Sequence, residues 1–183
     1  MIARIISDQV FYSSFAEKEF KYTYYGVSKM DIRIAQVADL QSIKELWKEM
    51  MDFHRIRDEY FARSDEGHER FGEYVRSNIE SPEWLVMVAV EDTHVIGFSM
   101  GRIATYPPVF KHTHYGFVAD IVVNESFRGR GIGRQLFEGM VPWFREQGIT
   151  RVEIEVASTN EVSQAFWTRM GFREYMKKMI HEI

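Results

Sequence analysis

The chain has 183 residues, 45% of them hydrophobic, which is typical of one globular domain with a short extension. It contains no cysteine, which excludes disulfides, thiolate zinc sites and a cysteine nucleophile. A net charge of −4 gives no argument for nucleic acid, and no apolar run approaches a membrane span, so neither partner is expected.

The first half of the chain alternates between strand and helix patterns. Ile32 and Ile34 alternate with polar residues, which predicts a short strand, and Asp39 is the expected N-cap of a first helix. Apolar or aromatic residues at helical spacing support that helix: Ile43, Leu46, Trp47, Met50, Met51 and His54. A second helix is expected to end at Ser81-Pro82, and the apolar runs 84–90 and 95–103 predict a hairpin.

The second half continues this alternation. A loop is expected at Tyr106-Pro107-Pro108, followed by a strand that ends at Val123 and a helix that begins after Gly131. Pro142 should kink that helix or end it early. Further along, we expect a strand over 151–157, a short helix over 161–170 and a weak strand in the tail. The whole predicts one α/β unit.

Residues 1–29 are an aromatic-rich extension that lacks the pattern of a secretory signal. Met30 would be a natural start for the domain at 30–183. The extension could be an upstream translation artefact, an extra strand or a dimerisation arm. We favour an aromatic arm packed on its own or a neighbouring subunit, which leaves a homodimer open.

The most informative motif is the run from Arg128 to Gly133, Arg-Gly-Arg-Gly-Ile-Gly, between an apolar strand and an amphipathic helix. Backbone N–H groups at such a turn, together with the helix dipole, favour an anion, and arginines add donors suited to phosphate. An ordinary strand-to-helix turn with solubilising arginines is the simpler alternative. No G-x-x-x-x-G-K-[S/T] occurs, which excludes a P-loop. The glycine spacing also departs from the dinucleotide fingerprint, although Glu153 and Glu155 lie where a ribose-binding acid would be sought.

Arg128-x-x-Gly131-x-Gly133 resembles the [R/Q]-x-x-G-x-[G/A] signature of the GNAT acetyltransferase superfamily. A second stretch, from Asn160 to Phe172, is similar to the family's N-x-x-A-x-x-x-[Y]-x-x-x-G-F segment. The resemblance covers the chain from about Asp31 onward. It implies an α/β GNAT fold, with a central mixed, mostly antiparallel sheet of about six to seven strands flanked by about four helices.

The resemblance also implies a cofactor site for acetyl-CoA. Backbone groups from Arg128 to Arg134 would hold the pyrophosphate, and strand residues would bind the pantetheine arm through their main chain. The residues concerned are Ile121, Val122, Val123, Arg128, Gly129, Arg130, Gly131, Ile132, Gly133, Arg134, Asn160 and Phe166. Asn160 could equally be a helix cap and Phe166 a core residue.

The catalytic residues are less clearly indicated. Asp120, just before the pantetheine segment, is the candidate base for removing a proton from an amine, and Glu155 is the second choice. A structural carboxylate at Asp120 and a solvent-facing Glu155 are the alternatives. Trp167 stands where family members often carry a tyrosine that protonates the thiolate, and indole cannot supply that proton.

For the acceptor pocket we consider Trp167 together with His54 and Asp58, which lie one helical turn apart. Ordinary helix-end polarity would explain His54 and Asp58 as well. His112-x-His114 has a metal-like spacing, but no carboxylate pattern completes a site, so we expect a loop pair and no metal.

These observations predict a cytoplasmic N-acetyltransferase that moves acetyl from acetyl-CoA to a primary amine by direct attack in a ternary complex. The acceptor could be a small molecule or a protein amine. Two other classes remain open: an acyl-CoA sensor with the same fold and no turnover, and a dinucleotide oxidoreductase.

Overall fold

The computed structural model describes residues 30–183, so the predictions for the extension lie outside the described residues. The strands are β1 (Met30–Ile34), β2 (Trp84–Glu91), β3 (His94–Thr105), β4 (His114–Val123) and β5 (Val152–Glu153). The helices are α1 (Leu40–Arg55), α2 (Gly67–Ile79), α3 (Ile132–Glu146) and α4 (Glu161–Arg169). Short 3-10 turns lie at Val37–Asp39, Glu59–Phe61 and Glu125–Phe127.

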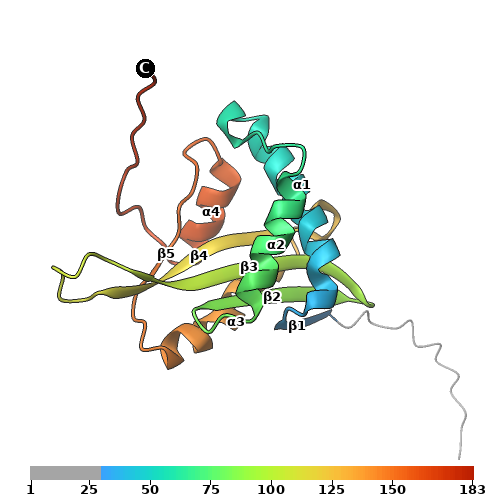
Figure 1. Ribbon diagram of the computed structural model, residues 1–183, viewed down its shortest axis with the longest axis horizontal. Helices are drawn as coiled ribbons and strands as arrows, with labels where there is room; N and C mark the ends of the chain where they lie inside the picture. The colour runs from blue at the N-terminus through green and yellow to red at the C-terminus, as the bar shows by residue number, and fades with distance from the viewer. Residues whose placement is uncertain (1–29) are drawn as a thin grey trace, which may run out of the picture.

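The sheet has the order β1-β2-β3-β4-β5 (Figure 1). Its first four strands are antiparallel, and β5 runs parallel to β4. The predicted hairpin is confirmed: β2 and β3 are joined through Asp92 and Thr93, whose φ angles of 48° and 75° suit a tight turn between twisted strands. The sheet is therefore mixed and mostly antiparallel, as expected.

Helices cover both faces of the sheet (Figure 1). Helices α1 and α2 pack on one face, where Ile43, Val75 and Phe98 are buried. Helices α3 and α4 contribute Leu136, Phe144 and Trp167 to the other core. Phe144 fits because Gly116 in β4 has no Cβ, which would lie 2.6 Å from the Phe144 ring.

Two expected strands differ from the structure. Only Val152–Glu153 forms a ladder within 151–157, and residues 173–183 form none, so the described sheet has five strands rather than about six to seven. Ile154 and Val156 still pack against the core of α3, which explains their alternation. Alternation reports which side chains are buried, whereas a strand also needs a partner for its backbone.

Two local expectations also change. Helix α3 continues through Pro142 to Glu146, so an early end is wrong: Met140 and Phe144 flank the proline and are buried, which outweighs one lost backbone donor. Asp39 does occupy the position before α1, but its carboxylate is used elsewhere. It accepts two hydrogen bonds from Arg33, at 2.7 and 2.8 Å, and one from the Gln36 amide.

Candidate functional site

The glycine turn leads directly into α3. Gly129 and Gly131 both have φ of +78°, a left-handed conformation that an L side chain rarely adopts. The first helical hydrogen bond of α3 is the one from the Gln135 amide to the Gly131 carbonyl, at 3.1 Å. The amides of Ile132, Gly133 and Arg134 therefore precede the helical ladder, at the positive end of the helix dipole.

Strand β4 has an open edge beside this turn. Its pairs with β5 are limited to Gly116 and Phe117, so from Val118 onward that edge has no strand partner among residues 30–183. The Asn124 amide donates to the Ile96 carbonyl, toward β3, so by strand alternation the main-chain groups of Ile121 and Val123 face the open edge. An extended chain with amide groups could pair there as an added strand.

A β-bulge in β4 decides the face of the sheet on which the Asp120 side chain lies. Asp120 pairs with Met100 and Val118 pairs with Gly101, which leaves Ala119 as an extra residue on β4. Asp120 consequently shares the sheet face of the buried Met100, the face covered by α1 and α2. Burial raises the pKa of Asp120 from its ordinary 3.8 to about 6. A carboxylate of this pKa is ionised at pH 7 and is a stronger base than an ordinary aspartate.

The arginine side chains of the turn already have partners in the protein. Arg128 Nε donates to the Val123 carbonyl at 3.1 Å, Arg130 pairs with Glu91 at the end of β2, and Arg134 Nε donates to Glu138 at 2.8 Å. Anion binding at the turn would therefore depend first on the backbone amides.

Helix α4 lies against the turn. A Cβ on Gly133 would lie 3.4 Å from the Phe166 ring, which shows how closely α4 approaches α3. Asn160 is buried and accepts from the Ser163 amide at 3.1 Å, so it caps α4. Trp167 is 5% exposed and packs edge-on against Phe137 and Phe172, so its ring belongs to the core.

The remaining predicted site residues, His54, Asp58 and Glu155, make contacts that do not involve Asp120. Asp58 accepts from the Tyr60 amide at 3.0 Å and caps the 3-10 turn. His54 packs on Phe53 and Phe61, and burial, with the nearby Arg57, lowers its pKa. Glu155 is an exposed side chain 3.9 Å from Lys178.

The register places a row of partly exposed side chains next to Asp120. Trp84 pairs with Arg102, Arg102 with Phe117, and Phe117 with Glu153, so four strands contribute to the row. It lies on the same face as Asp120, and all four residues are partly exposed. Sequence reasoning missed this row because its members come from four separate segments, and pairing register is not visible in local patterns.

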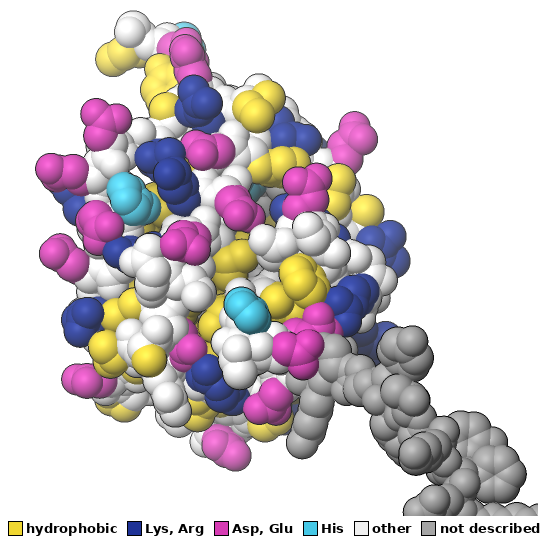
Figure 2. Space-filling view, turned by 90° about the vertical axis from the view of Figure 1, so that its right-hand side faces the viewer, with side chains coloured by type: hydrophobic (Ala, Val, Ile, Leu, Met, Phe, Trp, Pro, Cys, Tyr) yellow, Lys and Arg dark blue, Asp and Glu magenta, His cyan; other side chains and the backbone are white. Residues whose placement is uncertain are grey.

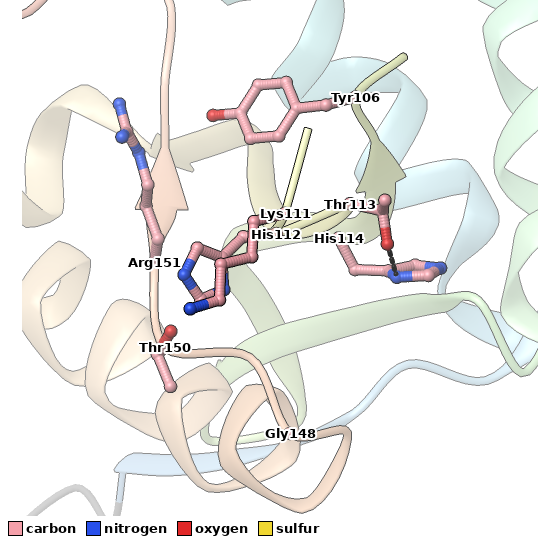
Figure 3. A pocket seen from close by; sticks show the side chains of 8 residues that line it. All are labelled: Tyr106, Lys111, His112, Thr113, His114, Gly148, Thr150 and Arg151. Atoms are coloured by element: carbon pink, nitrogen blue, oxygen red, sulfur yellow. Dashed lines mark hydrogen bonds between the residues drawn. The ribbon is translucent and has the colours of Figure 1, made fainter. Parts of the chain in front are cut away.

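A separate hollow of about 380 Å³ lies at the other end of β4. Figure 3 shows its lining: Tyr106, Lys111, His112, Thr113, His114, Gly148, Thr150 and Arg151. The imidazoles of His112 and His114 point in different directions, and His114 Nδ1 lies 2.9 Å from the Thr113 hydroxyl. The two imidazoles therefore do not face a common point in the described structure.

Other features of the described chain bear on partners. Within residues 30–183, no group of three or more histidine or acidic side chains could hold a metal, and no helix is long and apolar enough to cross a bilayer. On the face in Figure 2, acidic and basic side chains are interspersed.

Comparison with known proteins gives one family. Residues 43–172 match the profile described as the acetyltransferase (GNAT) family. A curated relative, the glucosamine 6-phosphate N-acetyltransferase of Trypanosoma brucei brucei, is 31% identical over 64 residues, or 35% of this chain and 42% of that protein. The chain spans less than half the length of the first curated relatives it matches.

Solved structures show the same fold. A tetramutant of the BH1408 protein from Bacillus halodurans superposes with a TM-score of 0.74 at 23% identity, covering 84% of this chain and 99% of that one. The aminoglycoside N-acetyltransferase AAC(6')-Iy, solved in complex with CoA, has a TM-score of 0.70 at 23% identity, covering 87% and 97%.

Proposed function

Because the chain belongs to the acetyltransferase (GNAT) family, we propose that it transfers acetyl from acetyl-CoA to a primary amine by direct attack in a ternary complex. The observation that carries the proposal is the open edge of β4, which runs into a left-handed glycine turn and the start of α3. These features fit a ligand that combines an amide-bearing arm with a pyrophosphate. The relative AAC(6')-Iy, which has the same fold, was solved with CoA.

Different residues bind the different parts of acetyl-CoA in this proposal. Backbone amides between Arg128 and Arg134 hold the pyrophosphate, above all those of Ile132, Gly133 and Arg134, because they lie at the start of α3 and precede its helical ladder. The main chain of Ile121 and Val123 pairs with the pantetheine arm at the open edge, and one amide there polarises the thioester carbonyl. Phe166 and Asn160 line the α4 side.

Asp120 acts as the general base. An amine of pKa near 10 is almost fully protonated at neutral pH, so it must lose a proton before it attacks. Asp120 takes this proton, directly or through water, and its burial supplies the raised pKa that makes it competent. The amine nitrogen then attacks the thioester carbonyl carbon, the carbon–sulfur bond breaks, and the departing thiolate takes a proton from water or a neighbouring group.

Trp167 does not serve as the acid. It is buried among aromatic rings, and its indole N–H is far too weak an acid to protonate a thiolate. A thiolate is a good leaving group, so the reaction does not require a strong acid. The row of Trp84, Arg102, Phe117 and Glu153 is the acceptor surface in this proposal, since it adjoins Asp120 and its side chains are partly exposed.

Steady release of free thiol from acetyl-CoA in the presence of an amine panel tests this function. Turnover that depends on an added amine supports the enzyme. Binding of acetyl-CoA without thiol release for any amine would identify a sensor instead.

A further inference from the structure

Arg102 holds its guanidinium over two aromatic rings in the proposed acceptor surface. The guanidinium carbon lies 5.8 Å from the Trp84 ring centre and 5.3 Å from the Phe117 ring centre. Trp84 and Phe117 are also its cross-strand partners, so the three side chains share one face. This arrangement restricts the long side chain and pre-organises its charged end.

The charge of Arg102 is not balanced by a carboxylate. Among residues 30–183, no acidic side chain forms an ion pair with it, and its guanidinium donates no hydrogen bond. The nearest acid in the row, Glu153, is already engaged: it lies 2.7 Å from Arg151 Nε and accepts a bond from the Tyr106 hydroxyl. Asp120, which lies on the same face, is partly buried and is assigned to the amine in the proposed reaction.

Arg102 also lies at a suitable distance from Asp120. Met100, the cross-strand partner of Asp120, is two residues before Arg102 on β3, so Asp120 and Arg102 are diagonal neighbours whose Cα atoms lie about 7–8 Å apart. One small molecule can therefore place an amine at Asp120 and a second group at Arg102. A planar guanidinium with five donors binds carboxylate or phosphate through paired hydrogen bonds, whereas it repels a second cation.

We propose that the acceptor is a small amine that also carries a carboxylate or phosphate, and that Arg102 binds this anionic group. The inference rests on the proposed acetyl transfer. It goes further by naming the acceptor class and the residue that selects it, and it disfavours polyamines and other polycationic amines.

The experiment compares matched acceptor pairs by release of free thiol. One pair is glucosamine and glucosamine 6-phosphate, which tests phosphate; the other is β-alaninamide and β-alanine, which tests carboxylate. Spermidine serves as the polycationic amine. We expect the anionic member of at least one pair to have the higher kcat/KM, and Arg102→Gln to lower that value by about 10- to 100-fold.

Two further variants separate binding from structure. Arg102→Lys keeps the positive charge but loses the paired donors of the planar guanidinium. It should therefore retain more of the preference for anionic acceptors than Arg102→Gln does. Arg145→Gln, in α3 on the opposite face of the sheet, should leave the preference unchanged. Arg102→Gln should lower kcat/KM for the anionic members by at least about fivefold more than for the uncharged members, since only the anionic members make a charge-assisted bond there.

The outcomes distinguish this inference from the proposed function. Equal or better turnover of uncharged acceptors or spermidine, or an equal loss for both members of a pair in Arg102→Gln, overturns the inference and leaves acetyl transfer standing. If no acceptor releases thiol, calorimetric titration of the same pairs into the CoA-saturated protein decides. Arg102-dependent binding of an anionic member supports the inference while acetyl transfer fails, and no such binding overturns it.

Discussion

Replacing the partly buried Asp120 by asparagine should lower activity and raise stability in the same protein. Burial raises the pKa of this aspartate from 3.8 to about 6, so its charged form is disfavoured in the folded state. The difference corresponds to about 3 kcal/mol. In the wild type, protonated Asp120 favours the folded state, because the folded state binds this proton more tightly than the unfolded chain does. Its contribution to the free energy of unfolding is fully present below about pH 4 and is lost as the pH rises through about 6.

The variant Asp120→Asn carries no charge at this position and avoids that cost. At pH 7 we expect its free energy of unfolding to rise by up to about 3 kcal/mol, which corresponds to an increase in Tm of about 6–12 °C for a chain of this size. The gap between variant and wild type should close as the pH falls below about 4. Thermal unfolding followed by circular dichroism across this pH range measures both effects.

Activity should change in the opposite direction. Loss of the base should lower turnover at pH 7 by about 10²-fold or more, and a higher pH should partly rescue it because more amine is then neutral. In the wild type, kcat/KM should fall below about pH 6, where Asp120 becomes protonated. The pH profile of the variant should not show this fall. Asp31→Asn, an exposed change in β1, is the matched control. Near-normal turnover in Asp120→Asn, or a fall in its stability at pH 7, would refute the reasoning, and loss of turnover in Glu155→Gln instead would move the base to Glu155.

Three other predictions concern the cofactor site and the core. Acetyl-CoA at 100 times its dissociation constant should stabilise the fold by about 2.7 kcal/mol in thermal shift, and NADH or ATP by much less; equal effects would indicate a generic anion site. Gly131→Glu should abolish acetyl-CoA binding in calorimetry while the protein stays folded, because φ is +78° there and a carboxylate would repel the pyrophosphate. Unchanged affinity in a folded variant would place the phosphate site elsewhere. Gly116→Ala should destabilise the fold by about 1–3 kcal/mol in chemical denaturation, because its Cβ would lie 2.6 Å from Phe144; an unchanged midpoint would mean that the ring moves freely.

The sequence by itself determined the family and the order of elements as far as α4, both of which are confirmed, whereas the strand expected in the tail does not form. Local signals were sufficient for this. Apolar residues at helical spacing mark the helices, and two apolar runs on either side of a short polar turn mark the hairpin. Such signals act over a few neighbouring residues, so they can be read along the chain.

Tertiary structure alone decided what several polar side chains do. Asp39, Asp58 and Asn160 are engaged by backbone amides or, for Asp39, also by an arginine. The same residue types would suit a cap or a binding site, and only the positions of their partners distinguish the two.

Tertiary structure also decided the neighbourhood of Asp120. The bulge at Ala119 turns Asp120 to the α1–α2 face, and the register brings Arg102 and Glu153 to the same row. These contacts join residues from separate strands, and a shift of one position in register would send each side chain to the other face. The glycine turn at the start of α3 was therefore readable from the sequence, whereas the proposed acceptor surface required the folded sheet.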